Sequence, residues 1–285
     1  MHPSIFMLEK ELLEHKIVTR LPAFIALCGF MLFVGIFFSS SAQHNLFFQM
    51  EFSGDVSDIH MEFVRDLNML ITFGAGLVSL ILSTLYLPKT LRKERQEGSS
   101  MFWRSMPVSN LMTHAVKLSF GLLVVPIICS LLVLFSDLLL WIINLTSDKQ
   151  LALLVEQESL VYVLTNWITF LGRMFMVALA LLPFACVMLM VSQIVSSPLI
   201  VILVVVYASK WLAISLFGFY GIDQFLSEML MLPVNILFSP NPFAAFGGAT
   251  GLYLVTYFVL GSLALWASLN LNRTNEVSWK SLLNR

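Results

Sequence analysis

Three ionisable side chains stand inside stretches of sequence that are otherwise apolar, at Asp137, Arg173 and Lys210. A charge near the centre of a membrane-spanning helix costs about 2.5–3.5 kcal/mol on insertion scales, so such residues commonly pair with each other or line a polar path. Two interpretations stay open. The three residues form a polar patch on a path across the membrane, or Asp137 forms a static ion pair with Arg173 or Lys210, with Lys210 able to extend to the membrane surface.

Other residue types that carry chemistry are scattered along the chain. The five histidines fall in separate segments without the spacing of metal ligands: His2, His15, His44, His60 and His114. No G-x-x-x-x-G-K-[ST] sequence is present, so the chain has no phosphate-binding loop of that kind. We therefore expect no catalytic residue, no metal site and no cofactor in this chain.

The segment Tyr86–Leu118 combines positive charge with aromatic and helix-breaking residues. Gly98-Ser99 can end one helix and cap another, and Pro107 would end a short helix over Ser100–Met106. That helix would carry an apolar and basic group of side chains: Met101, Phe102, Trp103, Arg104 and Met106. Such a group suits a groove in a cytoplasmic partner, or it anchors the protein at the membrane interface. The residue types favour neither interpretation.

The composition indicates the class of protein that holds these residues. Of 285 residues, 58% are hydrophobic and 12% are charged, whereas soluble domains average about 45–50% and 25%. A net charge of −1 argues against a nucleic-acid-binding protein, and 24 Phe with 15 Met argue against disorder. The sequence therefore predicts an all-α polytopic membrane protein.

About 20 apolar residues are needed to cross a bilayer as a helix. By that measure the chain has six predicted spans within a single transmembrane domain of residues 1–285: Leu21–Ser39, Leu67–Leu87, Leu118–Ile143, Trp167–Val191, Pro198–Phe217 and Gly251–Leu271.

Orientation follows from the positive-inside rule. Twelve Lys and Arg residues fall on one side of the predicted spans, whereas the opposite loops hold only Arg65 and Lys149. Both termini are therefore expected in the cytoplasm. A competing interpretation is signal-peptide cleavage near Ser40-Ser41-Ala42, which would leave five spans, but the apolar run is long for a signal peptide and about 20 residues precede it.

Two further segments have distinctive patterns. Residues 3–20 place apolar side chains on one half of a helical wheel, which predicts a helix that lies along the membrane interface. Pro22 is expected to separate this helix from the first span. The alternative is a solvated, charged segment that precedes the first span. Residues 218–248 are apolar but rich in Gly and Pro, which predicts a helical re-entrant segment on the outer side before the last span.

Residues 88–117 are predicted to form a cytoplasmic coupling loop, and their sequence is similar to that of a known protein family. Within this loop, Glu94-Arg95, Gly98-Ser99-Ser100, Ser105-Met106-Pro107-Val108-Ser109 and Lys117 resemble the E-R, G-(S/T), S-L-P-V-S and K signature of ABC-2-type transporter permeases, with Met106 where leucine is commoner. The six spans, the N-terminal surface helix and the apolar segment before the last span are similar to that family as well.

This resemblance implies that Ser100–Met106 is a coupling helix and that the signature residues contact a separate ATPase subunit: Glu94, Arg95, Met101, Phe102, Trp103, Arg104 and Met106. It also implies a second permease copy, identical or related, ATP and Mg bound only by the partner ATPase, and an exporter in a bacterial cytoplasmic membrane. The alternatives are a stand-alone secondary transporter and a membrane scaffold without transport activity.

Overall fold

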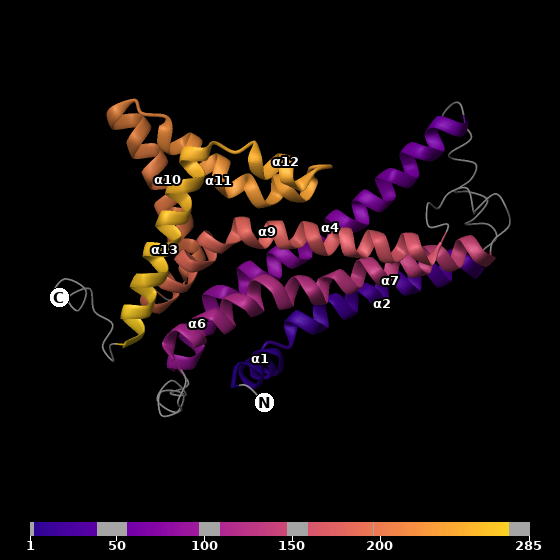
Figure 1. The fold of residues 1–285 in the computed structure, drawn as a ribbon, viewed down its shortest axis with the longest axis horizontal. Coiled ribbons are helices and arrows are strands. Elements are labelled where there is room, and N and C mark those ends of the chain that lie inside the picture. Colours follow the sequence, from indigo (N-terminus) through magenta and orange to yellow (C-terminus); the bar gives the residue numbers. More distant parts are fainter. Residues whose placement is uncertain (1–2, 39–55, 97–108, 147–158, 196, 274–285) are drawn as a thin grey trace. The chain divides into compact units, whose positions relative to one another are not determined.

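Apolar helices dominate the structure, which is a computed structural model that describes residues 3–38, 56–96, 109–146, 159–195 and 197–273. Every regular element within those residues is a helix (Figure 1). Six of these helical stretches are long and apolar enough to cross a membrane. The all-α prediction with six spans is confirmed, and the protein is a polytopic integral membrane protein.

The helices have the following bounds: α1 Pro3–Glu14, α2 Ile17–Phe38, α4 Val56–Gln96, α6 Asn110–Ser119, the π-helix η1 Phe120–Val124, α7 Val125–Thr146, α9 Leu160–Ile194, α10 Pro198–Phe217, α11 Gly221–Phe238, α12 Pro242–Gly247 and α13 Gly251–Arg273. The candidate spans within them are Ile17–Gly35, Leu67–Leu91, Asn110–Leu145, Leu160–Ile194, Pro198–Phe217 and Gly251–Leu271.

Three of the helical stretches are longer than a membrane requires. Helix α4 has 41 residues and α9 has 35, which at 1.5 Å per residue gives about 60 Å and about 52 Å against a hydrocarbon core of about 30 Å. Helices α6, η1 and α7 also follow one another without a break. Pro88 and Pro183 lie inside α4 and α9 without ending them. Membrane helices tolerate proline where neighbouring helices, Ser or Thr side chains or local adjustments satisfy the freed backbone groups.

The N-terminal region differs from the prediction in one respect. The helical break falls at His15-Lys16 rather than at Pro22, and α2 begins at Ile17 and runs through the proline. Pro22 lies in the second turn of α2, close to the helix start, where few backbone hydrogen bonds are lost to its missing N–H group.

The chain divides into two compact units, and the long helices contribute to both. The first unit comprises Met1–His15, Ile81–Val125 and Phe175–Arg285. Within it α1 packs on α6, α6 on α13, and α11 contacts α10, α12 and α13 (Figure 1). The predicted segment at 218–248 thus consists of two helices, α11 and α12, in the described structure.

Helix ends in the first unit follow local sequence. Ser109 caps α6 by accepting a hydrogen bond from the backbone N–H of Met112 at 3.2 Å. Pro198 begins α10, and Gly218 ends that helix with a φ of 59°, a left-handed conformation that glycine adopts without strain. The π-turn η1 packs closely on α4: a β-carbon on Gly121 would lie 3.1 Å from Tyr86, and the Gly121 carbonyl accepts a 2.6 Å hydrogen bond from Ser83.

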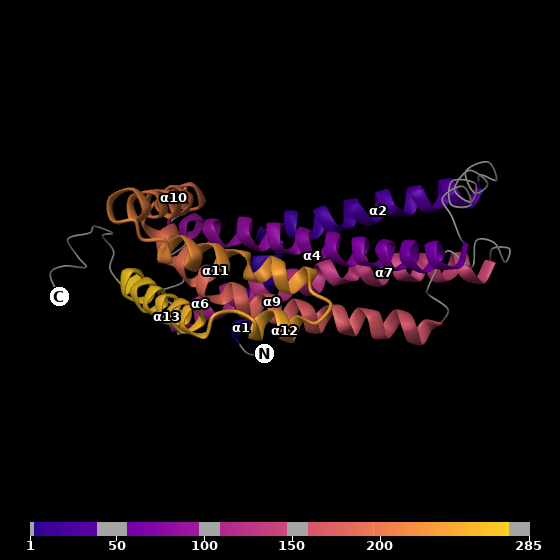
Figure 2. The same ribbon diagram turned by 90° about the horizontal axis from the view of Figure 1, so that it is seen from above.

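The second unit comprises Lys16–Leu80 and Pro126–Met174, which are α2, the first part of α4, most of α7 and the first part of α9. Figure 2 shows α2 and α7 extending in the same direction in this unit, whereas in Figure 1 the first part of α4 diverges from both. Phe30 of α2 and Phe135 of α7 have ring centroids 6.5 Å apart. Helix α2 is exposed along much of its length, which suits a helix that faces lipid.

Candidate functional site

A buried ion pair joins the N-terminal helix to α6 in the first unit. Lys117 Nζ lies 2.7 Å from Glu11 Oε1, and the two residues are 1% and 4% exposed. The other carboxylate oxygen of Glu11 accepts a 2.8 Å hydrogen bond from the Tyr86 hydroxyl of α4. We call Glu11, Tyr86 and Lys117 the α1 clamp. A charge-assisted pair with a further hydrogen bond is among the stronger polar contacts in proteins.

Two neighbouring side chains complete the surroundings of the clamp. His15 Nε2 lies 3.5 Å from Glu11 Oε2, and the His15 and Tyr86 rings meet edge to face with centroids 4.8 Å apart. Tyr86 also packs on Phe120, at a centroid distance of 4.8 Å. Glu11 is thus held by Tyr86 of α4, Lys117 of α6 and His15, which directly follows α1.

Opposing effects set the pKa of the Glu11 carboxyl. Burial raises the pKa, while the charge of Lys117, the hydrogen bonds from Lys117 and Tyr86, and the charge of His15 lower it. The lowering effects together outweigh burial, and the pKa of Glu11 stays below its ordinary value of 4.5. Glu11 is therefore a carboxylate at neutral pH, the state that a salt bridge to Lys117 requires.

The clamp touches both helices that flank the predicted coupling loop. Tyr86 lies ten residues before Gln96, where α4 ends, and Lys117 lies in the last turn of α6, which begins at Asn110. Glu11 therefore joins α1 to α4 ahead of the segment that resembles ABC-2-type permeases, and to Lys117, the last residue of that segment.

Helix α1 packs on the protein through a face different from its apolar one. Met7 and Glu11, one turn apart, are buried, whereas the apolar residues on which the interfacial-helix prediction rests remain exposed, among them Ile5 at 51%, Phe6 at 56% and Leu13 at 63%. An apolar helix face left uncovered by the protein suits contact with the acyl region of a membrane surface.

A second buried polar group, in the same unit, joins α6, α9 and α13. His114 Nδ1 lies 2.9 Å from the Asn110 carbonyl, which can only accept, so Nδ1 carries the proton of the neutral ring. His114 Nε2 then accepts from Ser268 Oγ at 2.9 Å, and the Gln193 amide donates to Ser268 Oγ at 2.6 Å and to the Ser268 carbonyl at 3.1 Å. With a neutral His114 ring, each of these four hydrogen bonds has one donor and one acceptor. We call His114, Gln193 and Ser268 the three-helix knot.

The second unit contains a polar network between three of its helices. Asp137 of α7 is fully buried, and its Oδ2 accepts a 2.7 Å hydrogen bond from the Asn166 amide of α9. Asn166 also donates to Asn68 of α4 at 3.2 Å, and Asn68 donates to the Tyr162 hydroxyl at 3.0 Å. Asp137 therefore lies in a hydrogen-bonded network, not in an apolar environment.

The other two predicted intramembrane charges have different surroundings. Arg173 is half-buried on α9, two helical turns beyond Asn166 and on the same side of that helix. Lys210 of α10 forms an ion pair with Asp223 and a 3.3 Å hydrogen bond to Ser227, both on α11. The pairing of Lys210 with α11 was not among the predicted arrangements. Asp137 and Arg173 belong to the second unit and Lys210 to the first.

A carboxylate also links α11 to α13. Glu228 accepts hydrogen bonds from the backbone N–H and the hydroxyl of Thr250, which directly precedes α13. A negative charge there complements the positive end of the helix dipole of α13. The ion pair of Lys210 and the bonds of Glu228 attach α11 to α10 and to the start of α13.

Most of the predicted partner-binding residues are not described by the structure. Glu94 and Arg95 belong to the last turn of α4. Met101, Phe102, Trp103, Arg104 and Met106 lie outside the described residues. The coupling helix at Ser100–Met106 therefore stays a prediction.

The α1 clamp and the three-helix knot were not predicted from the sequence. In the sequence, the burial of Glu11 is indicated only by its spacing of one helical turn from Met7 in an amphipathic helix. Lys117 was interpreted as one of the positive charges of the inner loop, not as a partner of Glu11. Asn68 and Asn166 could have been found as amides inside or beside the predicted apolar runs.

Comparison with known proteins gives no family assignment. No protein-family model, no curated protein and no solved structure matches this chain.

Proposed function

We propose that this protein is the membrane-spanning permease subunit of an ATP-driven ABC transporter, with export as its direction and a bacterial cytoplasmic membrane as its location. A separate ATPase subunit binds ATP and Mg, and docks on the cytoplasmic segment between α4 and α6. Two permease copies, identical or related, form the transport unit. The chain itself has no catalytic role.

The α1 clamp is the observation that best supports this proposal. A permease without its own ATPase must transmit force from a docked partner to its helices. Glu11 contacts Lys117 at 2.7 Å and Tyr86 at 2.8 Å, so α1 is connected to both of the helices between which the docking segment lies. A displacement of that segment is thereby passed to three helices at once.

Co-purification of the tagged protein from its native membrane tests the partner. We expect it to retain a protein with a P-loop sequence and ATPase activity. Replacement of Met101, Phe102 and Trp103 together by Glu should remove that protein, because charges would disrupt an apolar contact. The matched control is the same replacement of Phe47, Phe48 and Met50, which the sequence predicts on the opposite side of the membrane and which should leave co-purification unchanged. Retention of the ATPase by the Met101, Phe102 and Trp103 variant would contradict the docking site.

A secondary transporter is the second candidate, and the network around Asp137 favours it. A fully buried carboxyl group that accepts from Asn166 is a suitable group for binding and releasing a proton. Purified protein in liposomes, without any ATPase, would then accumulate a solute under a proton or sodium gradient, and Asp137→Asn would abolish that uptake. Such gradient-driven uptake would replace the ABC proposal.

A further inference from the structure

The exposed surface of α9 in the second unit is divided into a polar side and an apolar side. At 3.6 residues per turn, Thr165 and Thr169 share one side of the helix with Arg173, whereas Leu164 and Ile168 share another. Leu164 and Ile168 are 51% and 63% exposed, as expected of side chains that face lipid. All five residues lie within the candidate span that α9 forms. We call Thr165, Thr169 and Arg173 the polar face of α9.

The polar face continues into the buried network of the same unit. Asn166, which donates to Asp137 at 2.7 Å, and Tyr162, which accepts from Asn68 at 3.0 Å, lie on the same side of α9 as the polar face. Polar groups therefore follow this side of the helix over about three turns, from Tyr162 to Arg173. A surface that meets only hydrocarbon has no need of such a stripe.

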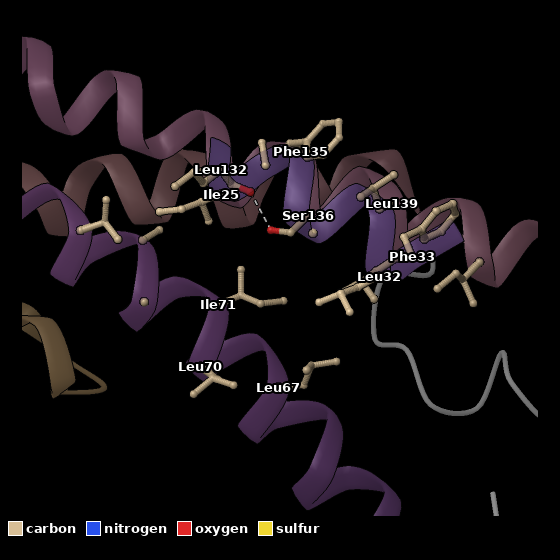
Figure 3. A pocket seen from close by; sticks show the side chains of 17 residues that line it. Ile25, Leu32, Phe33, Leu67, Leu70, Ile71, Leu132, Phe135, Ser136 and Leu139 are labelled. Atoms are coloured by element: carbon tan, nitrogen blue, oxygen red, sulfur yellow. Dashed lines mark hydrogen bonds between the residues drawn. The ribbon is translucent and has the colours of Figure 1, made fainter. Parts of the chain in front are cut away.

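The surface between α2, α4 and α7 of the same unit has the opposite character. Figure 3 shows Ile71 of α4 and Leu32 of α2 there, with Phe135 and Ser136 of α7. Ser136 supplies the one hydroxyl among the residues that line this surface, and it donates within its own helix, to the Leu132 carbonyl at 2.7 Å. Such a surface suits lipid. The contrast shows that the stripe on α9 is a feature of one helix side, not of the unit as a whole.

Arg173, rather than the threonines, indicates what the polar face contacts. The hydroxyls of Thr165 and Thr169 each donate at 2.8 Å to a carbonyl one turn earlier in α9, which also allows threonine to lie in an apolar medium. A guanidinium has no such option, because it stays charged. A charge at the centre of a membrane helix costs about 2.5–3.5 kcal/mol, and such residues face the protein interior or a water-filled cavity. Arg173 lies about 20 Å along the helix axis from Leu160.

The space beside Arg173 is not filled by the protein. A β-carbon on the neighbouring residue Gly172 would meet no heavy atom within 4 Å, and Thr169, one turn before Arg173, is exposed. Arg173 itself is half-buried, so part of its side chain borders this space. A guanidinium has five N–H donors and can bind a carboxylate or a phosphate through two parallel hydrogen bonds while it keeps other contacts. Water and an anion therefore suit this space better than hydrocarbon does.

We propose that the polar face of α9 lines a water-filled path in the membrane and that Arg173 binds an anionic group of a soluble solute there, a carboxylate or a phosphate. The inference rests on the proposed function only in treating that solute as the one that is transported. Its tests measure water access and anion preference without an ATPase. Their failure would therefore leave the docking of a partner ATPase unaffected, and loss of the docking proposal would leave these tests unchanged.

Cysteine reactivity tests the water-filled path. Thr169→Cys and Ile168→Cys are compared in the full-length protein with Cys28→Ala, which removes the exposed native cysteine, since the other two are buried. The two positions are both exposed and lie at the same depth, but on the polar and the apolar side of α9. The protein is held in phosphatidylcholine vesicles, with methanethiosulfonate ethylsulfonate on both sides of the membrane. Thr169→Cys should react at least about tenfold faster, because only the thiolate reacts and apolar surroundings suppress it.

The charge of the reagent tests the anion site. The ratio of the rate with the anionic sulfonate reagent to the rate with its trimethylammonium analogue is measured at Thr169→Cys and at Ser159→Cys, an exposed position just before α9. The ratio should be larger at Thr169→Cys by about fivefold or more, the effect of one nearby unit charge even at the dielectric constant of water. Arg173→Gln should remove this difference. Sodium phosphate at constant ionic strength should slow the reaction at Thr169→Cys only, and Arg173→Lys should weaken that protection, because an ammonium lacks the paired donors.

Four results would overturn the proposal. Equal rates at Thr169→Cys and Ile168→Cys would show that depth alone sets access, and no reaction at either would show that protein or lipid covers the polar face. Thr165→Cys and Leu164→Cys form the second pair, which serves if the first does not fold. A charge preference that survives Arg173→Gln would remove the anion site. Protection by phosphatidylglycerol in the vesicles, without protection by phosphate, would assign Arg173 to a lipid headgroup instead of a soluble solute.

Discussion

Gly261 of α13 lies so close to Pro183 of α9 that a β-carbon on Gly261 would stand 2.6 Å from both the Cα and the Cβ of the proline. Both residues belong to the first unit. The atoms that would be met are backbone and ring atoms, which cannot rotate away. Glycine at position 261 is therefore a condition for the contact between these two helices.

We expect Gly261→Ala to lower the thermal unfolding midpoint of the detergent-purified protein. Alanine normally stabilises a helix interior by about 1 kcal/mol relative to glycine, but overpacking costs about 1–3 kcal/mol and should dominate here. Gly172→Ala is the control, because its added methyl group meets no atom within 4 Å, and it should leave the midpoint unchanged or raise it. Equal midpoints for the two variants would show that α9 and α13 can separate without cost.

Loss of one member of the α1 clamp should be more costly than loss of both. Lys117→Met leaves the buried Glu11 carboxylate without its counter-charge, and we expect a loss of about 3–5 kcal/mol in the free energy of unfolding. Adding Glu11→Gln should recover most of that loss, since the amide oxygen of the introduced side chain can still accept from Tyr86 and no buried charge remains. Denaturant titration in detergent measures both values.

Another ion pair on α1 serves as the control for the clamp. Lys10 and Glu14 lie 3.5 Å apart, with side chains 19% and 30% exposed. Glu14→Gln should change the free energy of unfolding by only about 0.2–0.5 kcal/mol, the usual value of such helix pairs. A similar loss for Glu14→Gln and Lys117→Met would contradict a special role of the buried pair.

The lowered pKa of Glu11 predicts how the clamp responds to acid. A carboxyl group whose folded-state pKa is depressed contributes stability above its unfolded pKa and loses that contribution as pH falls through the folded value. The difference in unfolding midpoint between wild type and Glu11→Gln should therefore be constant above about pH 5 and should shrink below the ordinary value of 4.5. The comparison with Glu11→Gln removes the contributions of groups that do not contact Glu11. Because His15 contacts Glu11, the same comparison is repeated with His15→Gln in both proteins. A difference that shrinks already between pH 7 and 5 would contradict the direction of the shift.

The sequence predicted the six spans because apolar length alone decides whether a helix can cross a membrane. It did not predict where the helices end. Pro22 was expected to separate two helices and Pro88 to stand in a loop, yet both lie inside helices. The free-energy cost of a proline inside a helix depends on which group satisfies the backbone carbonyl that loses its hydrogen bond. That group is supplied by the tertiary structure, which the sequence pattern does not show.

The polar sites were predicted only in part, for a related reason. Asp137 was recognised because a charge in an apolar run is conspicuous. Glu11 and Lys117 were not recognised as partners, because 106 residues separate them and each stands in a segment with other charges. Pairing across such a distance is decided by how α1 packs on α6, and hydrophobic periodicity contains no information about that contact.

The three-helix knot gives a final prediction, for Ser268→Ala. The substitution removes the hydroxyl that donates to His114 and accepts from Gln193, while the Ser268 carbonyl can still accept from the Gln193 amide. Hydrogen bonds between membrane helices average about 0.6 kcal/mol and reach about 1.7 kcal/mol, so we expect a loss of about 1 kcal/mol in the free energy of unfolding. Ser262→Ala on the same helix should cost much less, because Ser262 donates only to the Val259 carbonyl within α13. If both serines can be replaced at equal cost, the hydroxyl of Ser268 does not join α6 and α9 to α13.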